Sequence, residues 1–206
     1  NKMGLISNGT TVFDAGAMSL GGSMTFIKKL TASSSATLSF VNGASGVVLD
    51  STYKKYEFHW VNCHPQTNGV TFQMNVSIDG GSNYNVAKTT TAFDAYHYED
   101  DSGAALQYLG SYDLAQGTGF QPIDFCSNQN DQSSCGKLQL FNPGSTTFVK
   151  HFISTAQDAW LDGSKGVSQN WFTGGYANTT SAVNAVQFKF SSGNIDAGTI
   201  SLYGIS

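Results

Sequence analysis

The sequence predicts an all-β protein, an antiparallel, jelly-roll-like β-sandwich preceded by an extended N-terminal arm. Charged residues make up only 12% of the 206 residues, about half the usual share, while glycine is abundant at 23 residues. Apolar and polar residues alternate with a period of two along most of the chain, and turn-forming residues separate the alternating segments. We therefore expect one sandwich domain over residues 24–206, a length that a single all-β domain commonly reaches.

The first 23 residues differ from the rest of the chain. Glycines interrupt short apolar pairs there, and no repeating period is sustained. Such a segment cannot bury its own apolar residues. We expect residues 1–23 to form an extended arm that crosses the domain or a neighbouring subunit and attaches through Leu5, Ile6, Val12 and Phe13.

The clearest predicted strand is residues 70–78, where five apolar residues alternate with four polar ones. This pattern indicates one buried and one solvated face, and the turn residues at 79–82 end the strand. No segment has helical spacing, and about eleven or twelve short strands indicate a β-sandwich, most often a jelly roll. The other expected strands lie near 36–40 and 56–60 and at 93–98, 106–112, 123–127, 137–141, 147–154, 168–176, 183–190 and 199–203.

The charged residues argue against two classes of partner. The net charge is −4, and every cationic residue is a lysine. Arginine supplies the two-pronged donor that recognises phosphates and guanine edges, so its absence argues against nucleic-acid binding. No polybasic stripe and no apolar run of ~20 residues is present, so we expect no membrane insertion.

The sequence contains no recognisable catalytic or metal-binding motif. The four histidines are scattered, and the adjacent Cys63 and His64 do not match an established metal-ligand spacing. A Gly-x-Ser-x-Gly nucleophile motif is absent. The 14 acidic residues could supply the carboxylate pair of a glycosidase, but the sequence does not identify such a pair. We expect no metal, no cofactor and no enzymatic activity.

Cys126 and Cys135 flank a polar stretch at residues 127–134. Two interpretations stay open for this pair. A disulfide could close residues 127–134 into a loop, or the two residues could be reduced thiols at strand ends, as in a protein made in a reducing cytosol.

A surface for sugars is a further hypothesis, because aromatic rings pack on the apolar faces of sugars. Most of the aromatic residues are needed for the core. Trp160 lies in a polar segment, residues 157–163, which we expect to be a loop, and it is the best candidate for an exposed ring. Tyr108 and Tyr112 are the other candidate carbohydrate contacts.

Two short segments near the end of the chain are distinctive: Ser-Ser-Gly-Asn-Ile at 191–195 and Tyr-Gly-Ile at 203–205. Together with several other segments, they resemble small structural proteins of tailed, mainly marine, bacteriophages, and the resemblance covers nearly the whole chain. It implies a virion component, with no catalytic residues to carry over. The remaining similar segments are residues 5–16, 49–53, 62–65, 92–101, 147–152 and 196–200.

From the resemblance and the arm-plus-sandwich pattern together, we expect a non-enzymatic structural protein on the surface of the particle, as a capsid decoration or fibre component. Its partners would be other virion proteins and further copies of itself, most often as a trimer. It would assemble in the host cytoplasm. The alternative is a carbohydrate-binding, host-receptor-binding head of a tail fibre or spike, and a glycan-degrading enzyme is the third candidate.

Overall fold

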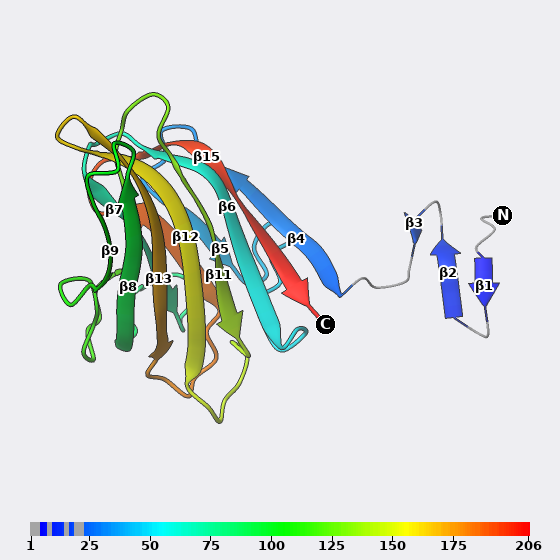
Figure 1. Ribbon diagram of the computed structural model, residues 1–206. Coiled ribbons are helices and arrows are strands. Elements are labelled where there is room, and N and C mark those ends of the chain that lie inside the picture. The colour runs from blue at the N-terminus through cyan, green and yellow to red at the C-terminus, as the bar shows by residue number, and fades with distance from the viewer. Residues whose placement is uncertain (1–4, 8–9, 15–16, 19–22) are drawn as a thin grey trace.

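The computed structural model describes residues 23–206 and, before them, the backbone of three short strands. The described residues contain strands, turns and loops and no helix, and two antiparallel sheets of eight and four strands pack as a sandwich (Figure 1). This confirms the predicted β-sandwich. The eight-stranded sheet consists, in spatial order, of β4 (Met24–Thr31), β15 (Ile195–Ile205), β6 (Lys55–Pro65), β11 (Ser134–Phe141), β12 (Lys150–Asp162), β13 (Lys165–Ala177), β8 (Lys88–Tyr98) and β9 (Ala104–Tyr108).

The smaller sheet has the spatial order β10-β7-β14-β5. Its strand pairs are nested in the chain in the manner of a jelly roll, because successive pairs alternate between the sheets: β8 with β9, β7 with β10, β6 with β11, β5 with β14 and β4 with β15. The β12–β13 hairpin is an addition that widens the larger sheet between β11 and β8. The bounds are β5 (Leu38–Val41), β7 (Val70–Ser77), β10 (Gln121–Cys126) and β14 (Ala185–Phe190).

The predicted N-terminal arm contains β1 (Leu5–Ser7), β2 (Thr10–Asp14) and β3 (Ala17–Met18), which pair in that order as an antiparallel meander. Leu5 pairs with Phe13 in the backbone register. The side chains of Leu5, Ile6, Val12 and Phe13 lie outside the described residues, so their role in attachment stays a prediction.

The core consists of aromatic side chains from both sheets. On β6, Phe58 and Trp60 point toward the smaller sheet and are fully buried. Phe72 of β7 meets Trp60 at a ring-centroid distance of 5.6 Å and stacks on Phe188 of β14 at 5.9 Å. Burying an aromatic or large aliphatic side chain contributes roughly 1.5–3 kcal/mol each, so this cluster is the main source of stability.

The strand predicted at residues 70–78 is confirmed, but its second face is not solvated. Polar residues of β7 are buried along with the apolar ones. The amide of Asn75 donates hydrogen bonds to the backbone carbonyls of Tyr84, Thr118 and Gly119, which lie in two loops that cover this face. Backbone carbonyls of the two loops therefore take the place of water on the second face of β7. The alternation of apolar and polar residues could not reveal that loops cover this face.

Candidate functional site

The candidate site lies where the smaller sheet does not cover the larger one. The edge strand β10 packs across β11, β12 and β13. The segment at residues 109–120 continues along the edge of β8 through backbone hydrogen bonds, and its Leu109 and Tyr112 lie beside Asp94 of β8 and Gln107 of β9. Two adjoining hollows open there, of about 180 and 160 Å³, which share Asp94, Gln107, Trp160 and Gln169. We call the pair the inner hollow. It is also lined by Tyr96, Tyr98, Leu109, Tyr112, Phe125 and Trp171.

Strand pairing places the polar residues of the inner hollow. Asp94 on β8 is opposite Gln107 on β9, and Gln169 on β13 points to the same face. The Gln169 amide donates a hydrogen bond to Oδ2 of Asp94, and the Gln107 amide lies 3.5 Å from the same oxygen. Oδ1 of Asp94 and Oε1 of Gln169 are buried without a partner among the described residues. Two residues that line the hollow therefore carry an unsatisfied acceptor.

Trp160 supplies an unsatisfied donor to the same place. Its ring packs edge-on against Phe125 at 5.2 Å, and its Nε1 is buried without a hydrogen-bond partner among the described residues. Tyr112, which also lines the hollow, packs against Trp171 with ring centroids 5.1 Å apart. The hollow thus has aromatic walls, with hydrogen-bonding atoms between them.

A pair of buried acids, Asp158 and Asp124, adjoins the hollow. Asp158 lies on β12 between Ser134 on β11 and Gln169 on β13 in the sheet register, and both of its side-chain oxygens are buried and unpartnered among the described residues. Burial raises its pKa, and the nearby carboxylate of Asp124 raises it further. Burial also raises the pKa of Asp124, although a hydrogen bond from the Ser134 hydroxyl opposes this. At neutral pH these acids therefore favour their protonated forms.

The structure brings two of the three predicted carbohydrate contacts into the inner hollow, Trp160 and Tyr112. Trp160 is not in a loop as expected; it lies near the end of β12, which continues to Asp162. Tyr108 does not reach the hollow. It follows the inward-facing Gln107 on β9, so its side chain points to the opposite face of the sheet and is 61% exposed.

Sequence reasoning missed the polar residues of the hollow. Asp94, Asp158 and Gln169 all occupy inward positions of their strands, in phase with buried Ala92, Ala156 and Trp171. A polar residue in the apolar phase of an alternating pattern is the signal that could have found them, since buried acids are rare unless paired or functional.

A second notable surface is the outer face of the eight-stranded sheet, which is turned away from the smaller sheet. Phe93 of β8 stacks on Phe172 of β13 with centroids 4.8 Å apart. Leu106 and Tyr108 of β9 are 73% and 61% exposed beside them. We call these four residues the β8–β9 patch. It is an exposed apolar surface at one edge of the sheet.

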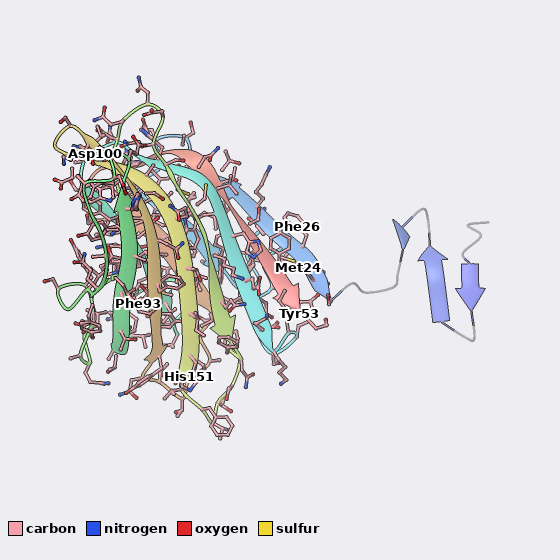
Figure 2. All side chains as sticks on the ribbon, in the orientation of Figure 1. Met24, Phe26, Tyr53, Phe93, Asp100 and His151 are labelled. Atoms are coloured by element: carbon pink, nitrogen blue, oxygen red, sulfur yellow. The ribbon has the colours of Figure 1, made fainter. Side chains whose placement is uncertain are left out.

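The other edge of the same face carries the β4–β15 patch, defined as Met24, Phe26 and Tyr203. Phe26 is 58% exposed and meets Tyr203 edge-on at 5.7 Å. Figure 2 shows the labelled Met24 and Phe26 on β4, separated from Phe93 by the intervening strands. The two patches therefore lie at opposite edges of one sheet.

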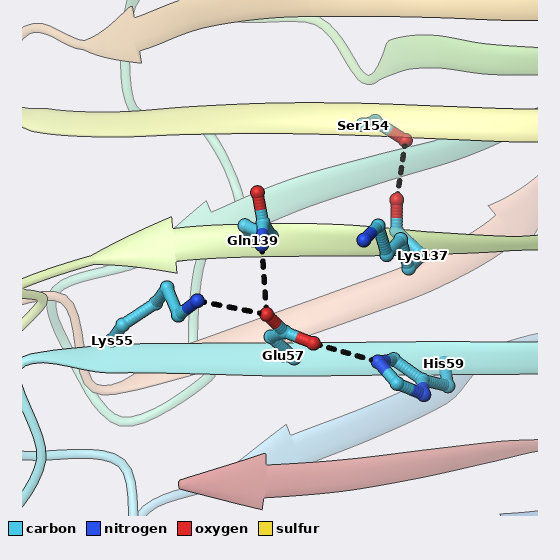
Figure 3. A network of polar contacts seen from close by, with 6 residues as sticks. All are labelled: Lys55, Glu57, His59, Lys137, Gln139 and Ser154. Carbon is cyan, nitrogen blue, oxygen red and sulfur yellow. Dashed lines mark hydrogen bonds and ion pairs between the residues drawn. The ribbon is translucent and has the colours of Figure 1, made fainter. Parts of the chain in front are cut away.

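A polar strip runs over β6 and β11, which lie between the two patches in the order of the sheet; its contacts are shown in Figure 3. The carboxylate of Glu57 accepts a hydrogen bond from the Gln139 amide at 2.7 Å and pairs with Lys55 at 3.0 Å and His59 at 2.8 Å. Burial raises the pKa of Glu57, but these three contacts outweigh it and lower the pKa to about 2. The centre of the face is thus charged and fixed in place.

The cysteines are free thiols in the structure. Cys126 is buried on β10, whereas Cys135 is on β11 of the other sheet, where it accepts a hydrogen bond from the backbone amide of Asn62 at 3.3 Å. No disulfide joins Cys126 and Cys135 in the structure. The described residues contain no group of three or more His, Cys, Asp or Glu side chains suited to a metal ion. Nor does any helix long and apolar enough to cross a membrane occur in that part of the chain.

Comparisons with known proteins identify no relative of this chain. No protein-family model, no curated protein and no solved structure matches this chain. The inner hollow and the outer face must therefore be interpreted from their own chemistry.

Proposed function

We propose that this protein is a non-enzymatic structural protein on the surface of a bacteriophage particle, and that the outer face of its eight-stranded sheet packs against a second copy of the chain. The observation that carries the proposal is the distribution of exposed apolar residues. Seven of the nine exposed large hydrophobic side chains in the described residues lie on that sheet, and only Ile78 and Phe148 lie elsewhere. Concentrated apolar exposure of this kind is typical of protein–protein contact surfaces.

The arrangement of the patches supports a closed ring. The β8–β9 patch and the β4–β15 patch differ in composition and lie at opposite edges of one face. In a head-to-tail contact, one patch of each copy meets the other patch of the next, and such contacts generate rings when the rotation closes. A trimer is the expected size.

Two further considerations support a place on a virion. The nested strand pairs have the jelly-roll arrangement that viral capsid and lectin domains use. Several sequence segments also resemble structural proteins of tailed bacteriophages. Attachment to other virion proteins through residues 1–23 and a position as capsid decoration or fibre component are parts of the same proposal.

The experiment is light scattering on the purified full-length chain at concentrations from about 5 to about 200 µM, a range in which weak contacts are detected. We expect a trimer, and we expect the double variant Phe93→Ser, Leu106→Ser to be monomeric. Phe148→Ser is the matched control, because Phe148 is 68% exposed but outside the sheet. A monomer at every concentration, or dissociation of the control to the same extent, would overturn the contact.

A further inference from the structure

The proposed assembly contact leaves the inner hollow unused, although this is where the unsatisfied polar atoms gather. Of the six buried side-chain atoms without a partner in the described residues, three belong to residues that line the hollow, and two belong to the adjacent Asp158. Asp94, Asp158 and Gln169 are each at least nine-tenths buried. Buried polar groups are normally paired, so these atoms indicate a missing polar partner.

We infer that the inner hollow binds one uncharged sugar ring at the end of a glycan. The residues that line the hollow carry unsatisfied acceptors at Asp94 and Gln169 and one unsatisfied donor at Trp160. Hydroxyl groups can satisfy both kinds, because each donates one hydrogen bond and accepts others. The inference does not depend on the assembly contact, which lies on the opposite face of the sheet.

The walls suit the apolar faces of a sugar. Trp160 with Phe125 and Tyr112 with Trp171 form two edge-to-face pairs in the lining. Aromatic rings supply a large apolar area, and a few polar atoms between them fix the orientation of a ligand. This is the composition expected of a site for a small, ring-shaped polyol.

The charge of the hollow selects against acidic sugars. The residues that line it include Asp94 and no lysine, arginine or histidine. Lys165, which lies 5.5 Å above the ring of Tyr98, is paired with Asp100 at 3.1 Å. An anionic sugar would add a carboxylate beside unsatisfied acceptors with no cation to neutralise it, and an unpaired charge in a desolvated site is costly.

The size of the hollow limits how much of a glycan enters. Its two parts, of about 180 and 160 Å³, are smaller than the roughly 300–1,000 Å³ of sites that enclose a drug-sized ligand. One ring therefore fits in the larger part, beside Trp171. The rest of the glycan would leave past Tyr96 and Tyr98, which line only the smaller part.

The test is ligand-observed NMR and intrinsic tryptophan fluorescence on the full-length chain. The probes are methyl glycosides of glucose, galactose, mannose and N-acetylglucosamine, with glucuronic acid and sialic acid as the charged comparison. We expect saturable binding of at least one neutral glycoside, and at least about tenfold weaker binding of both acids. We expect Trp160→Ala to lose that binding at least about tenfold.

Two variants keep the result interpretable. Gln107→Ala changes an exposed residue of the lining and is expected to weaken binding without unfolding the chain, which a thermal melt checks. Tyr108→Ala, on the next residue but the opposite face, is the matched control and should bind as the wild type does. Absence of saturable binding by any neutral glycoside, equal binding of the acids, or equal loss in Tyr108→Ala would overturn the inference. The oligomeric state, measured separately, decides the assembly proposal.

Discussion

Lys88 donates a hydrogen bond from its Nζ to Oδ1 of Asn75 over 2.6 Å, and so joins β8 of the larger sheet to β7 of the smaller one. A second hydrogen bond goes to the backbone carbonyl of Val86 at 2.8 Å. The lysine is fully buried, and neither of these partners is a carboxylate. Burial lowers its pKa to about 8.

This relationship predicts that stability rises with pH in the alkaline range. The unfolded chain holds the Lys88 proton more tightly than the folded chain does, because burying the charged lysine costs free energy. This cost lowers the stability in full below pH 8 and disappears as the pH approaches the ordinary pKa of lysine. The penalty amounts to about 3 kcal/mol, because a difference of one between the folded and unfolded pKa values corresponds to about 1.4 kcal/mol. Urea denaturation between pH 7 and 10 should show this rise in the wild type and not in Lys88→Met. Parallel pH profiles for the two proteins would contradict it.

For Asp158 we expect the opposite dependence: the stability of the fold should decrease with rising pH, in a lower pH range. Because burial raises its pKa, the folded chain retains a proton that the unfolded chain loses near pH 4, and stability falls as the pH rises above that value. We expect Asp158→Asn to increase the free energy of unfolding at pH 7 by on the order of 2 kcal/mol. Chemical denaturation at pH 5 and pH 7 measures the difference.

The exposed Asp131 provides the control for that variant. Asp131→Asn should change stability by less than about 0.5 kcal/mol at both pH values, as surface substitutions usually do. If Asp158→Asn were no more stable at pH 7 than Asp131→Asn, the buried acid would not destabilise the folded chain.

Glu57 holds the polar strip of the outer face together, and its removal should destabilise the sheet. Since contacts with Gln139, His59 and Lys55 overcome the effect of burial and lower its pKa to about 2, its contribution is present above pH 4.5 and is lost as the pH falls toward 2. We expect Glu57→Gln to cost about 1–2 kcal/mol at pH 7 and much less at pH 3. Lys137→Gln, on the same face but without a side-chain contact to Glu57, is the control. Equal costs at the two pH values would count against the network.

Gly136 lies where β11 passes over the indole of Trp60. A methyl group there would overlap the Trp60 ring and approach the Thr155 carbonyl oxygen to 2.5 Å. Gly136→Ala should therefore cost about 1–3 kcal/mol through overpacking. Gly174→Ala is its match on β13, with no atom within 4 Å of the added methyl, and should be neutral or slightly stabilising. Guanidinium denaturation compares the two, and a neutral Gly136→Ala would show that Trp60 can move.

The two-residue period was sufficient to predict the sandwich, because alternation reports directly on strands with one face in the core. It could not give the length of the β12–β13 hairpin. Residues 157–163 look like a polar loop, yet 150–162 is one continuous strand. Its backbone is paired along its whole length with β13 and over its first part with β11, and this pairing outweighs the polar residues.

The candidate site was only partly visible in the sequence for a related reason. Trp160 and Tyr112 are aromatic and stand out, but a one-residue difference in phase sends Tyr108 to the other face while Gln107 enters the hollow. Which strands meet across the sandwich is set by pairings between distant segments. Asp94 and Gln169 come together only through such pairing, as residues 75 positions apart in the chain.

The nested order of the strands also determines when this chain can fold during synthesis. β15 is inserted between β4 and β6, so Ile205 pairs with Met24 on one side and Lys55 on the other. The ribosome must therefore release β15 before the larger sheet can close, and contacts between such distant segments form slowly. Until then β4 and β6 each lack a neighbouring strand, and unpaired strand edges are prone to aggregation. Translation pauses or truncations ahead of β15 would leave these edges open to other chains.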